Sequence, residues 1–229
     1  MRQSTTFRII TTDLWEAEHH RYEGGMHHRM RMTVVRRASG GLWLHSPVPI
    51  DDELADTLAK LGRVEDIVAP NRFHYRFARD AKARYGGARL WAAPGLAEKR
   101  PEIAFDDQLS EGAPWKEELP AVSIGGAPAW SEYVFLHAAS GSLICTDLLF
   151  NVGDEPHAAT RVLYWALGVS AKFGTNRVWR WLAKDRLALR ESLDRVLSWR
   201  IERVVMAHGD VVNLRGPDEL ASALEPLRK

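Results

Sequence analysis

The sequence predicts an α/β fold with two β-rich halves and helices outside them. Short apolar segments rich in β-branched residues alternate with segments whose apolar residues recur at helical spacing. An acidic, irregular stretch from residue 101 to 120 separates the two halves. With 229 residues, 45% of them hydrophobic and 27% charged, the chain can bury a core and keep a polar surface. This composition excludes a disordered or fibrous protein.

The first half is expected to run strand, strand, helix, strand, helix, strand. Residues 28–50 form a hairpin around the turn Ser39-Gly40-Gly41, and a second turn at 23–25 precedes it. A helix starts at Asp51 or Asp52, has leucines at helical spacing and ends at Gly62. The remaining elements are a strand over 64–69, a helix over 73–85 and a strand over 88–92.

The second half combines hairpin strands with a helical segment. The connection over 101–120 is expected to contain one short strand. Further strands are predicted at 121–124, 133–137, 143–147 and 201–206, and helices within 157–200 and at 218–227.

Charge and cysteine content limit the functions to consider. The formal net charge is +1, so we expect neither nucleic acid nor an anionic membrane as the main partner. The single cysteine, Cys145, excludes an internal disulfide and a cysteine-rich zinc cluster. No run approaches the roughly 20 apolar residues of a membrane span, and residues 1–12 do not resemble a signal peptide. These features predict a cytoplasmic protein that binds a small-molecule substrate or ligand.

Polar residues just past the ends of predicted strands are the candidates for chemistry. Asn71 and His74 follow one strand, and Asp147 and His208 follow two others. Glu132 stands at the opposite, N-terminal end of its strand. The imidazoles and carboxylates among them are suitable ligands for zinc, iron or manganese.

The arrangement of these motifs resembles a known family. The segments that carry the resemblance are Ser46-Pro47, residues 69–74 (Ala-Pro-Asn-Arg-Phe-His), 130–135 (Trp-Ser-Glu-Tyr-Val-Phe), 146–150 (Thr-Asp-Leu-Leu-Phe) and 207–209 (Ala-His-Gly). Over about residues 14–224 the chain resembles the uncharacterised DUF4336 family, which is similar to the metallo-β-lactamase superfamily. The resemblance implies a four-layer αββα sandwich, α/β in class, with one domain over 1–229, a helical insertion at about 155–200 and a metal site between the two halves.

The resemblance also assigns positions within that site. Asp147 matches the superfamily's metal-bridging Asp, and His208 matches its last His. Asn71 stands where the first His of a His-x-His-x-Asp-His motif would be. Phe73, Tyr75 and Arg76 replace the other three members of that motif, and His74 lies one position from an expected ligand.

Two functions follow from this pattern, and a third, oxygen chemistry at an iron centre, is also open because a set of His and carboxylate ligands accepts iron. If the five candidates converge, His74, Glu132, Asp147 and His208 hold one divalent metal for hydrolysis of a small ester, thioester, lactone or phosphoester. Asp147 or Glu132 would then orient the attacking water or act as general base, and Asn71 would polarise the substrate's oxygen. The alternative is a catalytically silent relative without metal that binds a ligand or partner in the same cleft.

Three other patterns have weaker interpretations. The pairs His19-His20 and His27-His28 face each other across a turn, but two imidazoles without a carboxylate make a poor metal site. Ser131, Asp147 and His208 have the order of a serine hydrolase but lack its Gly-x-Ser-x-Gly turn. Residues 172–203 carry nine basic and four acidic residues, a charge that can hold a phosphate-bearing substrate, RNA or a membrane surface. We interpret them as a solvated helical face, with Trp179, Trp181 and Trp199 turned into the core, that selects substrates.

Overall fold

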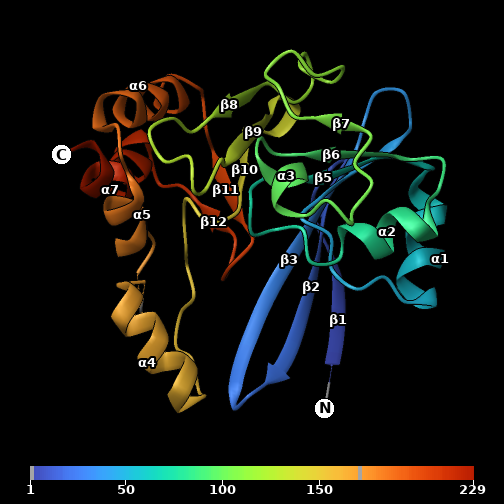
Figure 1. The fold of residues 1–229 in the computed structure, drawn as a ribbon, viewed down its shortest axis with the longest axis horizontal. Coiled ribbons are helices and arrows are strands. Elements are labelled where there is room, and N and C mark those ends of the chain that lie inside the picture. Colours follow the sequence, from blue (N-terminus) through green and yellow to red (C-terminus); the bar gives the residue numbers. More distant parts are fainter. Residues whose placement is uncertain (1–2, 170–171) are drawn as a thin grey trace.

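Two β-sheets lie at the centre of the computed structural model, which describes residues 3–169 and 172–229 (Figure 1). The first sheet has seven strands that are neighbours in chain order. They are β1 (Gln3–Thr11), β2 (Leu14–Glu23), β3 (Met26–Arg36), β4 (Leu42–His45), β5 (Val64–Ala69), β6 (Arg89–Ala92) and β7 (Asp107–Gln108). The first four pair antiparallel, and β4 to β7 pair parallel.

The second sheet has five strands in the order β12-β11-β10-β9-β8. They are β8 (Ala121–Ser123), β9 (Tyr133–His137), β10 (Ser142–Cys145), β11 (Arg203–Met206) and β12 (Val212–Asn213). Strands β10 and β11 are parallel, whereas β9 runs antiparallel to β10.

Helices cover the outer face of each sheet. Beside the first sheet are α1 (Asp52–Leu61), α2 (Ala78–Arg84) and the short α3 (Leu96–Lys99). The second half of the chain supplies α4 (Ala158–Leu167), α5 (Arg177–Leu182), α6 (Arg186–Leu197) and α7 (Pro217–Arg228). Figure 1 shows α5, α6 and α7 beside the second sheet, while α4 lies apart from them.

Three apolar clusters fill the spaces between four successive layers: helices, first sheet, second sheet and helices. This arrangement confirms the predicted four-layer αββα sandwich. One cluster lies between the first sheet and its helices and includes Leu54 of α1 and Leu44 of β4. A second lies under α5 to α7 and includes Trp179. The third joins the two sheets, with Trp43 of β4 against Phe135 of β9. Burial of apolar area on both faces of each sheet is what stabilises the four layers.

Several elements differ from those predicted. Strand β1, the short helix α3 and the short strand β12 lie outside the predicted elements, and β1 pairs along most of β2. The helix predicted to start at Phe73 starts at Ala78 instead. Residues 71–77 form turns, because the Asn71 side-chain oxygen accepts hydrogen bonds from the backbone N–H groups of Phe73 and His74. Among the described residues, no helix is long and apolar enough to cross a membrane.

A buried histidine between the sheets gives an expected pH dependence of stability. His45 is 1% exposed and stacks on Trp43. Burial, with a smaller contribution from His74, lowers its pKa to about 3. Because the folded pKa lies below the unfolded value of about 6.5, the neutral ring contributes stability above pH 6.5 that is lost as the pH falls toward 3.

Replacing His45 with Phe should therefore flatten the acid limb of the stability curve. Relative to His45→Phe, the wild-type free energy of unfolding should fall by about 3 kcal/mol more between pH 7 and pH 4. Urea unfolding at both pH values measures this difference, and between pH 7 and pH 8 the two curves should run parallel. Curves that remain parallel down to pH 4 would show that the ring is not the titrating group.

Candidate metal centre

The strand directions bring five candidate side chains to one edge of the sandwich. Asn71 and His74 follow the carboxyl end of β5, and Asp147 and His208 follow the parallel strands β10 and β11. Glu132 precedes β9, but β9 runs antiparallel to β10, so its amino end meets the carboxyl end of β10. Backbone bonds from Arg72 N–H to the Trp130 carbonyl (3.0 Å) and from Tyr133 N–H to the Pro70 carbonyl (2.9 Å) join the two halves here.

Three of these side chains present their donor atoms to one point. His74 Nε2 lies 3.4 Å from one Asp147 oxygen, and His208 Nε2 lies 3.4 Å from the other. The two Nε2 atoms are 3.2 Å apart. The side chains of His74 and Asp147 are 11% and 9% exposed and that of His208 is 21% exposed, so the group is largely sheltered from solvent.

Both imidazoles are held through their other nitrogen. His74 Nδ1 lies 2.7 Å from the Ser46 hydroxyl, which follows β4. His208 Nδ1 donates to the carbonyl of Arg29 at 3.0 Å, and its ring stacks on Phe150. Such bonds fix ring orientation and leave Nε2 of each ring free to act as a ligand.

Asn71 contacts both Asp147 and the turn that carries His74, and its side chain is shielded from solvent. Its amide nitrogen donates to Asp147 (2.7 Å) and to the Thr146 hydroxyl (2.9 Å), and the residue is fully buried. Its oxygen holds the turn that carries His74, as described above. With these partners its amide groups are already engaged, so the geometry favours a positioning role over contact with a substrate.

Glu132 has partners other than those predicted from the sequence. Its fully buried carboxylate accepts hydrogen bonds from the backbone N–H groups of Thr146 (2.8 Å), Asp147 (3.1 Å) and Leu148 (3.2 Å). It therefore shapes the loop that presents Asp147. Within the described part of the chain, the group of metal-compatible donors at this edge comprises His74, Asp147 and His208 without Glu132.

The two buried carboxyl groups have pKa values shifted in opposite directions. Burial raises the pKa of Glu132 to about 7, assisted by the negative charge of Asp147 and opposed by the Thr146 and Leu148 N–H groups. Burial also acts to raise the pKa of Asp147, but the imidazoles of His74 and His208 outweigh it and the net shift is downward. Asp147 is thus the group kept ionised, as a metal ligand must be.

Residues from outside the predicted set support the loops around the group. The Trp179 indole N–H of α5 donates to the Asp147 backbone carbonyl at 2.7 Å. The buried Arg31 of β3 donates to the Met206 carbonyl at 2.6 Å, two residues before His208. The aromatic and charged character of these two residues was visible in the sequence, but nothing in their spacing linked them to the site.

The other residues that the sequence patterns singled out lie in different surroundings. Tyr75 accepts a hydrogen bond from Arg100, Phe73 is 47% exposed, and the Ser131 hydroxyl donates to the Pro128 carbonyl. The prediction that Trp181 turns into the core is wrong, because this residue of α5 is 77% exposed while Trp179 on the same helix is fully buried.

The donor set fits a divalent transition metal. Ligand atoms around a tetrahedral zinc lie about 3.3 Å apart, given bonds of about 2.0–2.1 Å. The 3.2 Å between the two Nε2 atoms is close to that value, and each Nε2 lies 3.4 Å from a different Asp147 oxygen. One ligand atom from each of the three residues lies within 4.8 Å of the other two. Two imidazoles and one carboxylate suit zinc and also iron(II).

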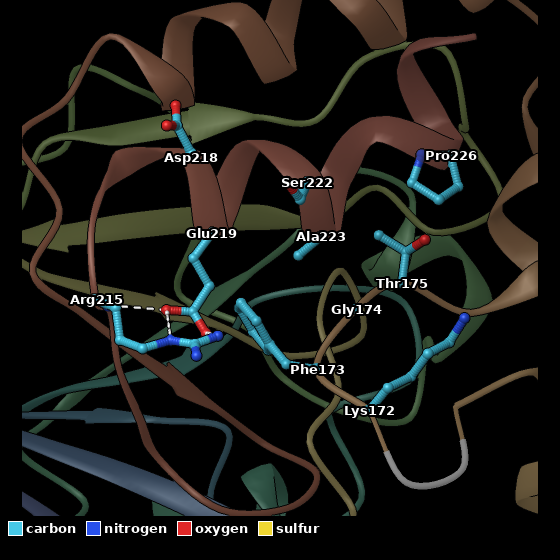
Figure 2. Close-up of a pocket in the computed structure, with 10 residues that line it drawn as sticks. All are labelled: Lys172, Phe173, Gly174, Thr175, Arg215, Asp218, Glu219, Ser222, Ala223 and Pro226. Carbon is cyan, nitrogen blue, oxygen red and sulfur yellow. Dashed lines mark hydrogen bonds and ion pairs between the residues drawn. The ribbon is translucent and has the colours of Figure 1, made fainter.

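A separate hollow lies at the other side of the second sheet and does not include this group. It has a volume of about 570 Å³ and lies between residues 172–175 and α7 (Figure 2). Arg215 and Glu219 form an ion pair at 3.0 Å on one side of it, and Phe173 lies beside that pair. The residues that line this hollow include none of the donors at the metal-compatible edge.

The αββα sandwich, with metal-compatible donors at one edge, identifies the class of fold. The chain has the metallo-β-lactamase fold. Solved structures of that class match it over nearly its whole length. The metallo-β-lactamase from Hirschia baltica has 11% sequence identity and a TM-score of 0.66, with 98% of each chain covered. The metallo-β-lactamase FIM-1 from Pseudomonas aeruginosa, in its mono-zinc form, has 12% identity and a TM-score of 0.64, covering 98% of this chain and 96% of that one.

A flavodiiron protein shares the fold as well. The metal-soaked Flv1 flavodiiron core from Synechocystis has 12% identity and a TM-score of 0.67, covering 99% of this chain and 61% of that one. No curated protein sequence matches. The sequence profile of the domain of unknown function DUF4336 matches residues 13–178, so the chain belongs to the DUF4336 family.

Proposed function

We propose that this protein is a metal-dependent hydrolase of a small ester, thioester, lactone or phosphoester, with one divalent ion held by His74, Asp147 and His208. The convergence of these three donors carries the proposal, because three separate loops bring one ligand atom of each within 4.8 Å of the other two. A bound ion of this kind would polarise the substrate's oxygen and acidify a water molecule.

The protein's own residues have distinct tasks in this proposal. His74 and His208 would each offer Nε2 to the ion, because Ser46 and the Arg29 carbonyl engage Nδ1 of each ring. Asp147 supplies the negative charge. Glu132 and Asn71 act as positioning residues, since they hold the Asp147 loop and the His74 turn.

Elemental analysis combined with hydrolysis assays tests the proposal. Purified wild-type protein should contain zinc, iron or manganese, and should hydrolyse at least one of p-nitrophenyl acetate, an acyl thioester, an acyl lactone and bis-p-nitrophenyl phosphate. His208→Ala should lose both this ion and the activity. His28→Ala is the matched control, because this imidazole on β3 lies outside the donor group.

A folded wild-type protein that hydrolyses none of these substrates after loading with each of the three metals would contradict the proposal. That result would favour the silent relative, in which the same cleft only binds a ligand. A variant His208→Ala that keeps full hydrolytic activity would equally overturn the assignment of the site.

A further inference from the structure

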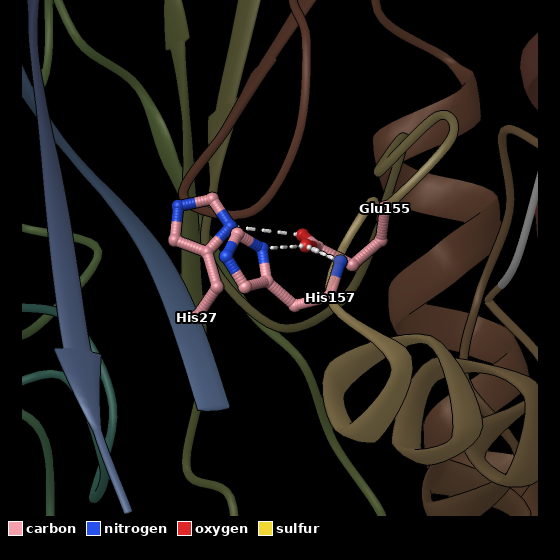
Figure 3. A group of neighbouring side chains, drawn as sticks. All are labelled: His27, Glu155 and His157. Carbon is pink, nitrogen blue, oxygen red and sulfur yellow. Dashed lines mark hydrogen bonds and ion pairs between the residues drawn. The ribbon is translucent and has the colours of Figure 1, made fainter. Parts of the chain in front are cut away.

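A second cluster of metal-compatible side chains lies where the β2–β3 hairpin meets the start of α4. It consists of His27 on β3 and of Glu155 and His157, which precede α4 (Figure 3). The side chains of His27 and Glu155 are only 6% and 4% exposed, whereas His157 is 38% exposed. The cluster shares no residue with the group at His74, Asp147 and His208.

The carboxylate of Glu155 lies between the two imidazoles. His27 Nδ1 is 3.0 Å from one of its oxygens and His157 Nδ1 is 2.8 Å from the other. Figure 3 shows both rings turned toward this carboxylate. One ligand atom from each residue lies within 4.8 Å of the other two, so small side-chain shifts would bring all three to the roughly 3.3 Å spacing of a tetrahedral zinc site.

The surroundings orient His27 as a ligand. Its Nε2 lies 3.0 Å from Nδ1 of His20 on the neighbouring strand, and Nε2 of His20 faces Glu18 at 3.7 Å. With its proton on Nε2, His27 would donate to His20 and leave Nδ1 free for a metal, the arrangement that ligating histidines ordinarily have. The ring also stacks on Tyr22, with 4.6 Å between centroids and 12° between planes.

Hydrogen bonds between the Thr160 side chain and the His27 backbone join the two segments independently of these rings. The Thr160 hydroxyl on α4 accepts a hydrogen bond from the His27 N–H at 2.7 Å and donates to the His27 carbonyl at 3.3 Å. The His157 N–H donates to Glu155 at 2.9 Å. The donors are therefore held in place from two segments about 130 residues apart, which reduces the ordering cost of binding.

We propose that His27, Glu155 and His157 bind a second divalent transition-metal ion of the zinc type, which fastens the start of α4 to the β2–β3 hairpin. Two imidazoles and one carboxylate form a borderline-soft set that suits zinc or cobalt(II) better than magnesium or calcium. The half-exposed His157 leaves a path by which the ion enters. The hairpin histidines lacked a carboxylate in the sequence, and Glu155 supplies it in the fold.

Cobalt(II) titration of apoprotein, followed by visible absorption and calorimetry, tests this site. In the Asp147→Asn/His208→Ala background, one cobalt ion per chain should still bind and give the absorption bands of a tetrahedral centre. Adding His157→Ala should weaken that binding by at least about 100-fold, more than the loss of a supporting residue around a metal. Glu155→Gln should do the same, whereas adding His28→Ala should leave it unchanged.

The two metal sites can fail separately. If the double variant binds no cobalt, or if His157→Ala and Glu155→Gln both keep the affinity within threefold, the second site does not exist, whatever the first site does. If the wild type binds one ion that His157→Ala removes and His208→Ala retains, the second site stands and the first one fails. Circular dichroism of each variant shows that the fold is kept in these comparisons.

Discussion

Replacing Glu132 with Ala is expected to lower the free energy of unfolding by about 3–5 kcal/mol, as breaking a buried charged network does. The fully buried carboxylate accepts from three consecutive backbone N–H groups, at Thr146, Asp147 and Leu148. Each of these donors would be left without an acceptor in a site that water fills poorly, at about 1–3 kcal/mol per group. Relief of the repulsion between Glu132 and Asp147 offsets a part of that cost.

Urea unfolding at pH 7 measures this loss, and Glu132→Gln is the matched control. The glutamine keeps one acceptor oxygen and the same length, so its cost should be smaller, about 1–2 kcal/mol. A loss below about 1 kcal/mol for Glu132→Ala would mean that the loop holds its shape without the carboxylate. In that case Glu132 would be available for the ligand role that the sequence suggested.

Asp147→Asn is expected to lower the metal affinity of the first site by at least about 100-fold, since even supporting residues around a metal contribute 10- to 100-fold. The substitution keeps the size of the side chain and an oxygen that can accept from Asn71. It removes the single negative charge that lies between the two imidazoles. Hydrolysis of any substrate found for the wild type should fall in parallel.

Zinc titration of the apoprotein in competition with a chelating dye measures this affinity. Asp80→Asn is the matched control, because Asp80 is an exposed carboxylate in the first turn of α2. Equal affinities for wild type and Asp147→Asn would remove Asp147 from the site. Circular dichroism of Asp147→Asn should match the wild type, since Trp179 holds the backbone carbonyl and not the side chain.

Most of the fold follows from local patterns in the sequence. Leucine spacing and the Asp51 cap predict α1, and the Leu54 N–H indeed bonds to that side chain at 2.9 Å. Errors arise where a single side chain outweighs the periodicity. Asn71 replaces the first turns of the predicted helix at Phe73. Strand β1 was missed although its signal is local: residues 3–11 are rich in β-branched residues and pair with β2 across a two-residue turn at residues 12–13.

The candidate site was predictable to the level of residue type and strand end. Asp147 and His208 follow parallel strands of one sheet, so their meeting is a consequence of topology. The hydrogen-bond partners of Glu132 were not predictable, since they depend on where three backbone N–H groups point after β10. The cluster at His27 and Glu155 was not predictable either, because its members approach only when α4 packs on β3.

The backbone bonds between Pro70 and Tyr133 and between Arg72 and Trp130 have a consequence for how the protein assembles. His74 belongs to the N-terminal half of the chain, while Asp147 and His208 belong to the C-terminal half. If these three residues hold the ion as proposed, a nascent chain still lacking β10 and β11 possesses one of the ligands, and high-affinity capture of the ion would await docking of the halves. Metal uptake would then report completion of folding.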